Sequence, residues 1–160
     1  MIEKVVSGGQ TGVDRAALDA AIAAGFACGG WCPRGRRAEG GPISDHYPLK
    51  ETSSSDYMDR TRRNVEDSDA TLIVAHGEPT GGTLATLVHA RRIAKPALVV
   101  DPAECIGDAP LEEISAWLDA HEIRVLNVAG SRESGHPGIY LEARDLITRL
   151  LEAVISRQSS

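Results

Sequence analysis

The chain has 160 residues, of which 42% are hydrophobic and 25% are charged, a balance typical of one folded globular domain rather than a disordered chain. Its 17 basic and 23 acidic residues give a formal net charge of −6 at pH 7. This charge argues against wholesale binding to nucleic acid or to an anionic membrane surface, because both need a strongly positive footprint. Aromatic residues are only 4% of the chain, too few for a platform that stacks single-stranded bases.

The sequence also predicts where the protein resides. No apolar stretch approaches the roughly 20 residues that a membrane helix needs. The first six residues, MIEKVV, lack the features of a secretory signal. Three cysteines, Cys28, Cys32 and Cys105, cannot all pair within one chain, which fits a reducing compartment. We therefore expect a cytoplasmic protein.

Short apolar runs alternate with helical patterns along the whole chain. The predicted strands cover residues 2–6, 26–31, 70–75, 97–100 and 124–128. The predicted helices cover residues 13–24, 56–67, 82–94, 110–121 and 139–154. The helix at 56–67 follows a serine cluster that can supply its N-cap. Residues 33–55 carry no regular pattern, and loops of that length are usually functional or mobile.

Continuous apolar runs this short are typical of strands buried on both faces, as in parallel sheets covered by helices. The alternation predicts an α/β fold: a doubly wound, mostly parallel sheet of about five strands with helices on both faces. There is no composition break and no internal repeat. We expect one domain over residues 1–157 and a frayed polar tail at 158–160.

The first candidate ligand loop is SGGQTGVD at residues 7–14, between the first strand and the first helix. Glycines let backbone N–H groups turn toward an anion, and a helix N-terminus adds partial positive charge. The predicted anion-binding residues are Gly8, Gly9, Gln10, Thr11 and Gly12. A tight turn without a ligand is the alternative. The glycine spacing is not that of a dinucleotide fingerprint, and no lysine follows as in a Walker loop.

Asp14 does not suit a simple anion cradle, because its charge would repel a phosphate. It can instead favour the helix dipole, bind a ligand hydroxyl or hold a metal ion. No metal ligands are predicted at zinc spacing, since Cys28 and Cys32 have no matching cysteine or histidine pair. Among the histidines, His76 is the one expected near the cleft, and no catalytic triad is evident.

A second glycine loop, Gly81, Gly82 and Thr83, opens the helix that follows the third strand. We expect it at the carboxyl end of a strand neighbouring the first, so that the two loops face each other across one cleft. A third loop after the last strand contains Gly130 and Arg132, and Arg132 either reaches over the cleft or is a solvated charge.

Two groups of arginines are further candidates for charge at the cleft. Arg34 and Arg37 lie in a basic loop after the second strand, either as a lid over an anion or as a solvated face. Arg60 and Asn64 share one helical face, which can present donors to the cleft while Met58 and Val65 pack inward.

The segment at residues 7–19, SGGQTGVDRAALD, resembles the opening signature of the molybdenum cofactor carrier proteins. The resemblance continues in order through residues 30–39, 47–52, 60–61, 64–65, 67–73, 81–83, 127–130 and 132–134. That family is similar to a wider nucleotide-binding group that includes the "lonely guy" phosphoribohydrolases and DNA-processing protein A. Ser131 departs from the pattern where proline is expected, and Gly40 and Gly41 where an acidic residue is usual.

The resemblance implies a Rossmann-like fold, self-association into dimers or tetramers, and binding of molybdenum cofactor or a related phosphate-bearing anion. A molybdoenzyme or a cofactor-synthesis protein is then the expected recipient. We therefore expect a non-catalytic carrier without catalytic residues. The first alternative is a sensor of a phosphate-bearing nucleotide or nucleotide derivative. The second is a nucleotide N-glycoside hydrolase, but Thr86 stands where the related phosphoribohydrolases carry their glutamate.

Overall fold

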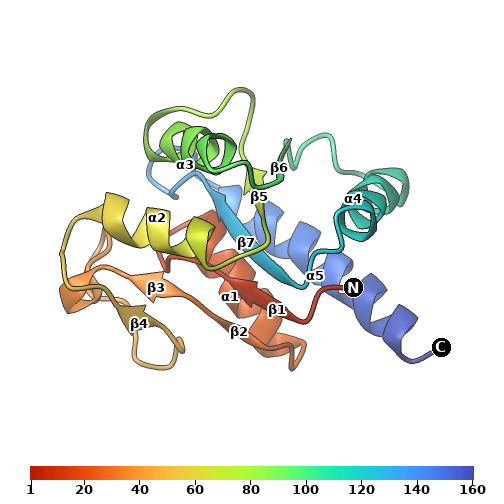
Figure 1. Cartoon of the computed structure of the whole chain (residues 1–160), viewed down its shortest axis with the longest axis horizontal. Coiled ribbons are helices and arrows are strands. Elements are labelled where there is room, and N and C mark those ends of the chain that lie inside the picture. The colour runs from red at the N-terminus through yellow and green to blue at the C-terminus, as the bar shows by residue number, and fades with distance from the viewer.

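A sheet of five parallel strands forms the centre of the computed structural model, which describes residues 1–160 (Figure 1). The strands are β1 Lys4–Val6, β2 Cys28–Gly29, β5 Ala70–Val74, β6 Ala97–Val100 and β7 Val125–Gly130. Their order in the sheet is β2-β1-β7-β5-β6. Val5 lies opposite both Cys28 and Leu126, so β7, the last strand in the sequence, pairs directly with β1, the first.

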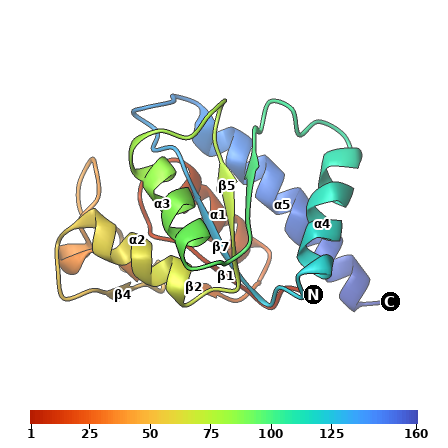
Figure 2. The same cartoon turned by 45° about the horizontal axis from the view of Figure 1, so that its top comes forward.

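Helices cover both faces of this sheet (Figure 2). They are α1 Val13–Ala23, α2 Tyr57–Glu66, α3 Gly81–Arg92, α4 Ala109–Ala120 and α5 Ile139–Gln158. Buried residues of α1, α4 and α5 share one core cluster with the strands, whereas α3 packs on the opposite face with α2 beside it. None of the helices combines the length and the apolar character needed to cross a membrane.

The alternation of side chains along β5 explains the two layers. Leu72 and Val74 belong to the core shared with α1 and α5, whereas Ile73 points to the other face and packs with Leu87 of α3. Successive residues of a strand point to opposite faces, so an apolar run fills both layers. The predicted doubly wound α/β fold is thus confirmed.

One predicted strand is in fact two. The run at residues 26–31 breaks at Gly30, where φ is +129° and an added Cβ would lie 2.3 Å from the Ser7 carbonyl oxygen. Beyond this bend, β3 Trp31–Cys32 leaves the main sheet and pairs with β4 Lys50–Glu51. Asn64 fixes the new direction, because its side chain accepts a hydrogen bond from the Trp31 N–H and donates one to the Trp31 carbonyl.

Three local expectations need correction. Residues 33–55 are not wholly irregular, since they contain β4 and the short 3-10 turn Arg34–Arg36. The N-cap of α2 is Asp56, whose side chain accepts from the Met58 N–H, and not a serine. Helix α5 extends through Gln158, the first residue of the predicted frayed tail.

Candidate functional site

A cavity of about 450 Å³ lies at the carboxyl ends of β1, β7 and β5. Its wall combines the three loops that follow these strands with one face of α2 and the start of α3. The lining residues are Gly8, Gln10, Asp14, Tyr57, Met58, Arg60, Thr61, Asn64, Thr80, Gly81, Gly82, Thr83, Thr86, Asn127, Val128, Ala129, Gly130, Ser131, Arg132, Gly135 and His136. Ligands of open α/β sheets bind at this edge.

The two glycine loops meet in this cavity, but they do not follow neighbouring strands as expected. Strand β7 lies between β1 and β5 in the sheet. Two strand spacings separate the loops by roughly 10 Å. The cavity is therefore long enough for a ligand with two distinct ends, and its middle is formed by the end of β7.

Most of the first glycine loop packs against the protein itself. The Gln10 N–H donates to Asp14 Oδ2 (3.2 Å), and the Thr11 N–H donates to Gln10 Oε1 (3.1 Å). An added Cβ at Gly9 would meet Leu49 and Ile43, and one at Gly12 would meet the backbone of the loop after β7. Gly9, Thr11 and Gly12 therefore lie outside the cavity lining, whereas Gly8, Gln10 and Asp14 belong to it.

Gln10 carries an unusual polar group. Its side chain is 5% exposed, and its oxygen accepts from the N–H groups of Thr11 and Glu39. Its Nε2 is the one buried side-chain nitrogen or oxygen atom in the chain without a hydrogen-bond partner. An unsatisfied buried donor costs about 1–3 kcal/mol, so an acceptor group placed beside this nitrogen would be favourable.

Asp14 and Arg60 place opposite charges in the same wall. Both are buried, and the Arg60 guanidinium donates to the Gly8 carbonyl oxygen at 2.7 Å. An added Cβ at Gly8 would lie 2.8 Å from Arg60 and 3.0 Å from Asp14, so only glycine lets both side chains approach. Burial raises the pKa of Asp14 above its ordinary value, while the charge of Arg60 opposes that shift.

The N-terminus of α3 forms the opposite end of the cavity. Thr80 is its N-cap but makes no side-chain capping bond, and the first turn contains no acidic residue. Added Cβ atoms at Gly81 or Gly82 would meet nothing within 4 Å, so the backbone there is open. Free N–H groups and the helix dipole make this end suited to an anion.

Arginines surround the aromatic ring of Tyr57 on the cavity wall. The guanidinium carbons of Arg37, Arg60 and Arg132 lie 4.3, 5.3 and 5.5 Å from its ring centre. Arg132 lines the cavity, and Glu39 lies 3.5 Å from it. Arg37 reaches the site only through Tyr57, and Arg34 is exposed outside the lining.

The family model described as the Circularly permutated YpsA SLOG family matches residues 5–151. The chain belongs to this family. No curated protein is significantly similar to it. Among solved structures, it is similar to the crystal structure of the "Putative molybdenum carrier protein" from Syntrophus aciditrophicus SB, at 45% identity and a TM-score of 0.90. The match covers 94% of this chain and 95% of that one.

In this member of the YpsA SLOG family, the predicted cleft histidine has another role. His76 Nδ1 lies 3.1 Å from Asp101 and its Nε2 lies 3.1 Å from Glu142, so both ring nitrogens are engaged away from the cavity. His136 lines the cavity instead. Desolvation lowers the pKa of His76, but the hydrogen bonds that its ring makes to Glu142 and Asp101, together with their negative charges, outweigh it and raise the pKa above its ordinary value.

The helical face of α2 held more site residues than the sequence indicated. Met58 was expected in the core but lines the cavity, as do Tyr57 and Thr61. The spacing of Tyr57, Thr61 and Asn64 at i, i+4 and i+7 places them on one face, so the same periodicity that identified Arg60 and Asn64 could have found them.

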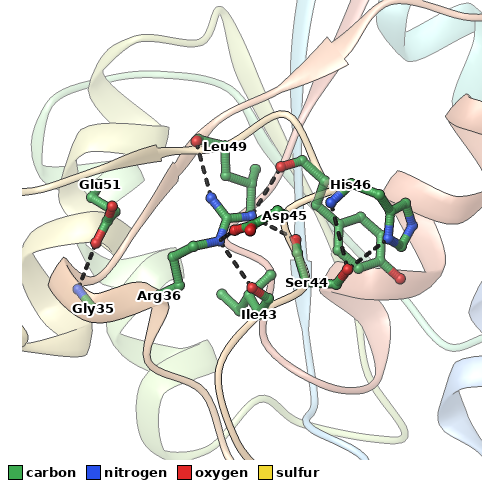
Figure 3. Close-up of polar contacts among 9 residues, drawn as sticks. Gly35, Arg36, Ile43, Ser44, Asp45, His46, Leu49 and Glu51 are labelled. Carbon is green, nitrogen blue, oxygen red and sulfur yellow. Dashed lines mark hydrogen bonds and ion pairs between the residues drawn. The ribbon is translucent and has the colours of Figure 1, made fainter.

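Arg36 lies in the same basic loop but was not among the arginines predicted to bind a ligand. Its guanidinium donates to the carbonyl oxygens of Ile43 (2.9 Å), Ser44 (2.7 Å), Tyr47 (3.0 Å) and Leu49 (3.3 Å), as Figure 3 shows in part. The side chains of Ile43 and Leu49 lie where a Cβ of Gly9 would stand. Arg36 therefore holds the 43–49 segment against the first glycine loop and shapes the site from outside it.

The cysteines contribute nothing to the cavity. Cys28, Cys32 and Cys105 are free, none of them lines it, and burial raises the pKa of each thiol. No group of three or more His, Cys, Asp or Glu side chains in the chain could hold a metal ion.

Proposed function

We propose that this protein binds molybdenum cofactor, or a related phosphate-bearing anion, as a carrier. The ligand would lie in the cavity between the loop after β1 and the start of α3. The observation that carries the proposal is the open N-terminus of α3 in a cavity that also contains Arg60 and Arg132. The similarity to a protein described as a molybdenum carrier supports the same role.

The residues present fit the chemistry of such a cargo. Gly81, Gly82 and Thr83 would hold its phosphate with backbone N–H groups, and Arg132 would add charge. Gly8, Gln10, Asp14, Arg60 and Asn64 would contact its other end, and Gly130 would form the middle of the wall. The chain offers no ligand set for molybdenum, so the metal would stay on the dithiolene sulfurs of the cofactor.

We propose binding rather than hydrolysis for a specific reason. Thr86, at the position of the phosphoribohydrolase glutamate, is buried in the wall and its hydroxyl donates to the Gly82 carbonyl oxygen at 2.9 Å. A hydroxyl used in this way is no general acid or base for a glycosidic bond. Incubation with AMP or GMP should release no free base, and steady release at catalytic rates would overturn the carrier role.

A nucleotide sensor would use the same cavity, so ligand preference separates it from a carrier. We expect isothermal titration calorimetry under anaerobic conditions to give one molybdenum cofactor per chain. A nucleotide derivative that binds more than tenfold more tightly than the cofactor would favour the sensor.

We also propose that the protein is a dimer or tetramer that delivers its cargo to a molybdoenzyme or cofactor-synthesis protein. Light scattering would test the oligomeric state, and pull-down with such a protein would test the delivery.

A further inference from the structure

The wall formed by the first glycine loop places a hydrogen-bond donor beside an acceptor. The Gln10 oxygen accepts from two backbone N–H groups, those of Thr11 and Glu39. Turning the amide over would set its NH₂ against both donors, so these bonds fix which end is nitrogen. The buried Nε2 is therefore a donor without a partner in the chain, and it is free to donate to an acceptor on a ligand.

Asp14 provides the acceptor next to this donor. Its Oδ2 accepts from the Gln10 backbone N–H, which ties the carboxylate to the residue that carries the free amide nitrogen. A carboxylate has about four lone-pair sites, so one backbone bond leaves further capacity. Asp14 and Gln10 both line the same cavity.

We propose that Gln10 and Asp14 recognise an aminopyrimidinone edge, the ring edge that pterins and guanine share, and that the ligand's phosphate lies at the α3 end. This inference rests on the proposed function and names the ligand class of the same cavity. The ring N–H and the exocyclic amine donate to Asp14, and the ring carbonyl accepts from Gln10 Nε2. Adenine offers its ring N1 to Nε2 and only one donor, its exocyclic amine, to Asp14, so it makes one hydrogen bond fewer than guanine.

Charge fixes the direction of such a ligand. The Asp14 carboxylate repels a phosphate, whereas the N-terminus of α3 attracts one. The strand β7 separates the two ends by roughly 10 Å, because two strand spacings lie between β1 and β5. A bare oxyanion such as molybdate or phosphate has no N–H group for Asp14, so it satisfies only the α3 end.

Four probes test this assignment by calorimetry on the full chain: ribose 5-phosphate, AMP, GMP and neopterin phosphate. GMP and neopterin phosphate should bind roughly tenfold or more tightly than ribose 5-phosphate, which is the discrimination expected of one good bidentate contact. AMP should bind roughly tenfold or more weakly than GMP, because it lacks the second donor to Asp14. The tighter of GMP and neopterin phosphate identifies a nucleotide or a pterin as the source of the ring.

Two isosteric variants test the roles of Gln10 and Asp14 in this recognition. Gln10→Glu keeps the oxygen that accepts from Thr11 and Glu39 but replaces the donor, and Asp14→Asn replaces an acceptor with a donor. In each, the preference for GMP over ribose 5-phosphate should fall below about threefold, whereas the exposed control Glu113→Gln should retain it. If Gln10→Glu does not fold, Asp14→Asn decides alone.

The outcomes separate the two proposals. Equal binding of all four probes by the folded protein, or full preference retained in Asp14→Asn, would overturn the ring assignment while leaving phosphate binding intact. Failure of ribose 5-phosphate to bind, with GMP still preferred over AMP, would support the ring assignment and contradict the phosphate end of the proposed function.

Discussion

Substitution of Gly82 by aspartate tests the anion end of the cavity without damage to the fold. An added Cβ at this position meets nothing within 4 Å, and the first turn of α3 has no acidic residue. A carboxylate there interacts favourably with the helix dipole by about 0.3–1 kcal/mol. Loss of glycine adds about 0.4–1 kcal/mol by restricting the unfolded chain. The variant should therefore be about 1 kcal/mol more stable than the wild type.

The same charge should weaken anion binding strongly. Two unit charges about 5 Å apart interact by roughly 3 kcal/mol at an effective dielectric constant of 20. This corresponds to an affinity loss of about a hundredfold. Gly82→Asn is the matched control, because it has the same shape without the charge.

Urea unfolding would measure the stability of both variants, and calorimetry with ribose 5-phosphate would measure their affinity. We expect Gly82→Asp to bind about a hundredfold more weakly than Gly82→Asn. Equal affinities in two folded variants would refute the placement of the phosphate at α3.

Three further predictions concern the residues that hold the site together. Arg36→Ala removes the donor to four carbonyl oxygens and should lower the free energy of unfolding in urea by about 2–3 kcal/mol. The control, Arg34→Ala at an exposed position, should change it by under about 0.5 kcal/mol. Equal effects of the two substitutions would contradict the role of Arg36 in holding the 43–49 segment. The folded-state pKa of His76 is raised, so its ion pairs stabilise the protein fully below its ordinary pKa of 6.5 and lose that effect as pH rises through the folded value. The stability difference between wild type and His76→Gln in thermal melts should accordingly shrink from pH 6 to pH 9, and a pH-independent difference would count against this pairing. Glu39→Gln should raise the affinity for ribose 5-phosphate by a few-fold because it releases Arg132, and a weaker affinity in calorimetry would show that Glu39 supports the binding geometry.

The sequence predicted the layers of the fold well because buried parallel strands are continuous apolar runs. The strand at residues 97–100 was predicted with its observed bounds. The sequence could not place β7 between β1 and β5, because strand order depends on pairing between segments far apart in the chain, such as Lys4 with Val125 and Ala70 with Leu126. Nor did it reveal the bend at Gly30, which a close approach to the Ser7 backbone requires.

For the candidate site, the sequence indicated the residue types more than their arrangement. A glycine-rich strand-to-helix loop is typical of anion binding, but the sequence does not tell whether its amides face a ligand or the protein. Here Asp14 and Gln10 accept the loop's own N–H groups, and Gly9 and Gly12 allow close packing instead. Arg36 was missed because its acceptors are backbone carbonyls, which leave no pattern in the sequence.

Native mass spectrometry with phosphorus and molybdenum analysis, on protein purified anaerobically from its own cells, tests the carrier role most directly. We expect one bound species per chain that contains both elements, and we expect the Gly82→Asp variant to lack it. A wild-type mass equal to that of the chain alone would contradict the carrier role. So would a ligand without phosphorus bound to both the wild type and the Gly82→Asp variant.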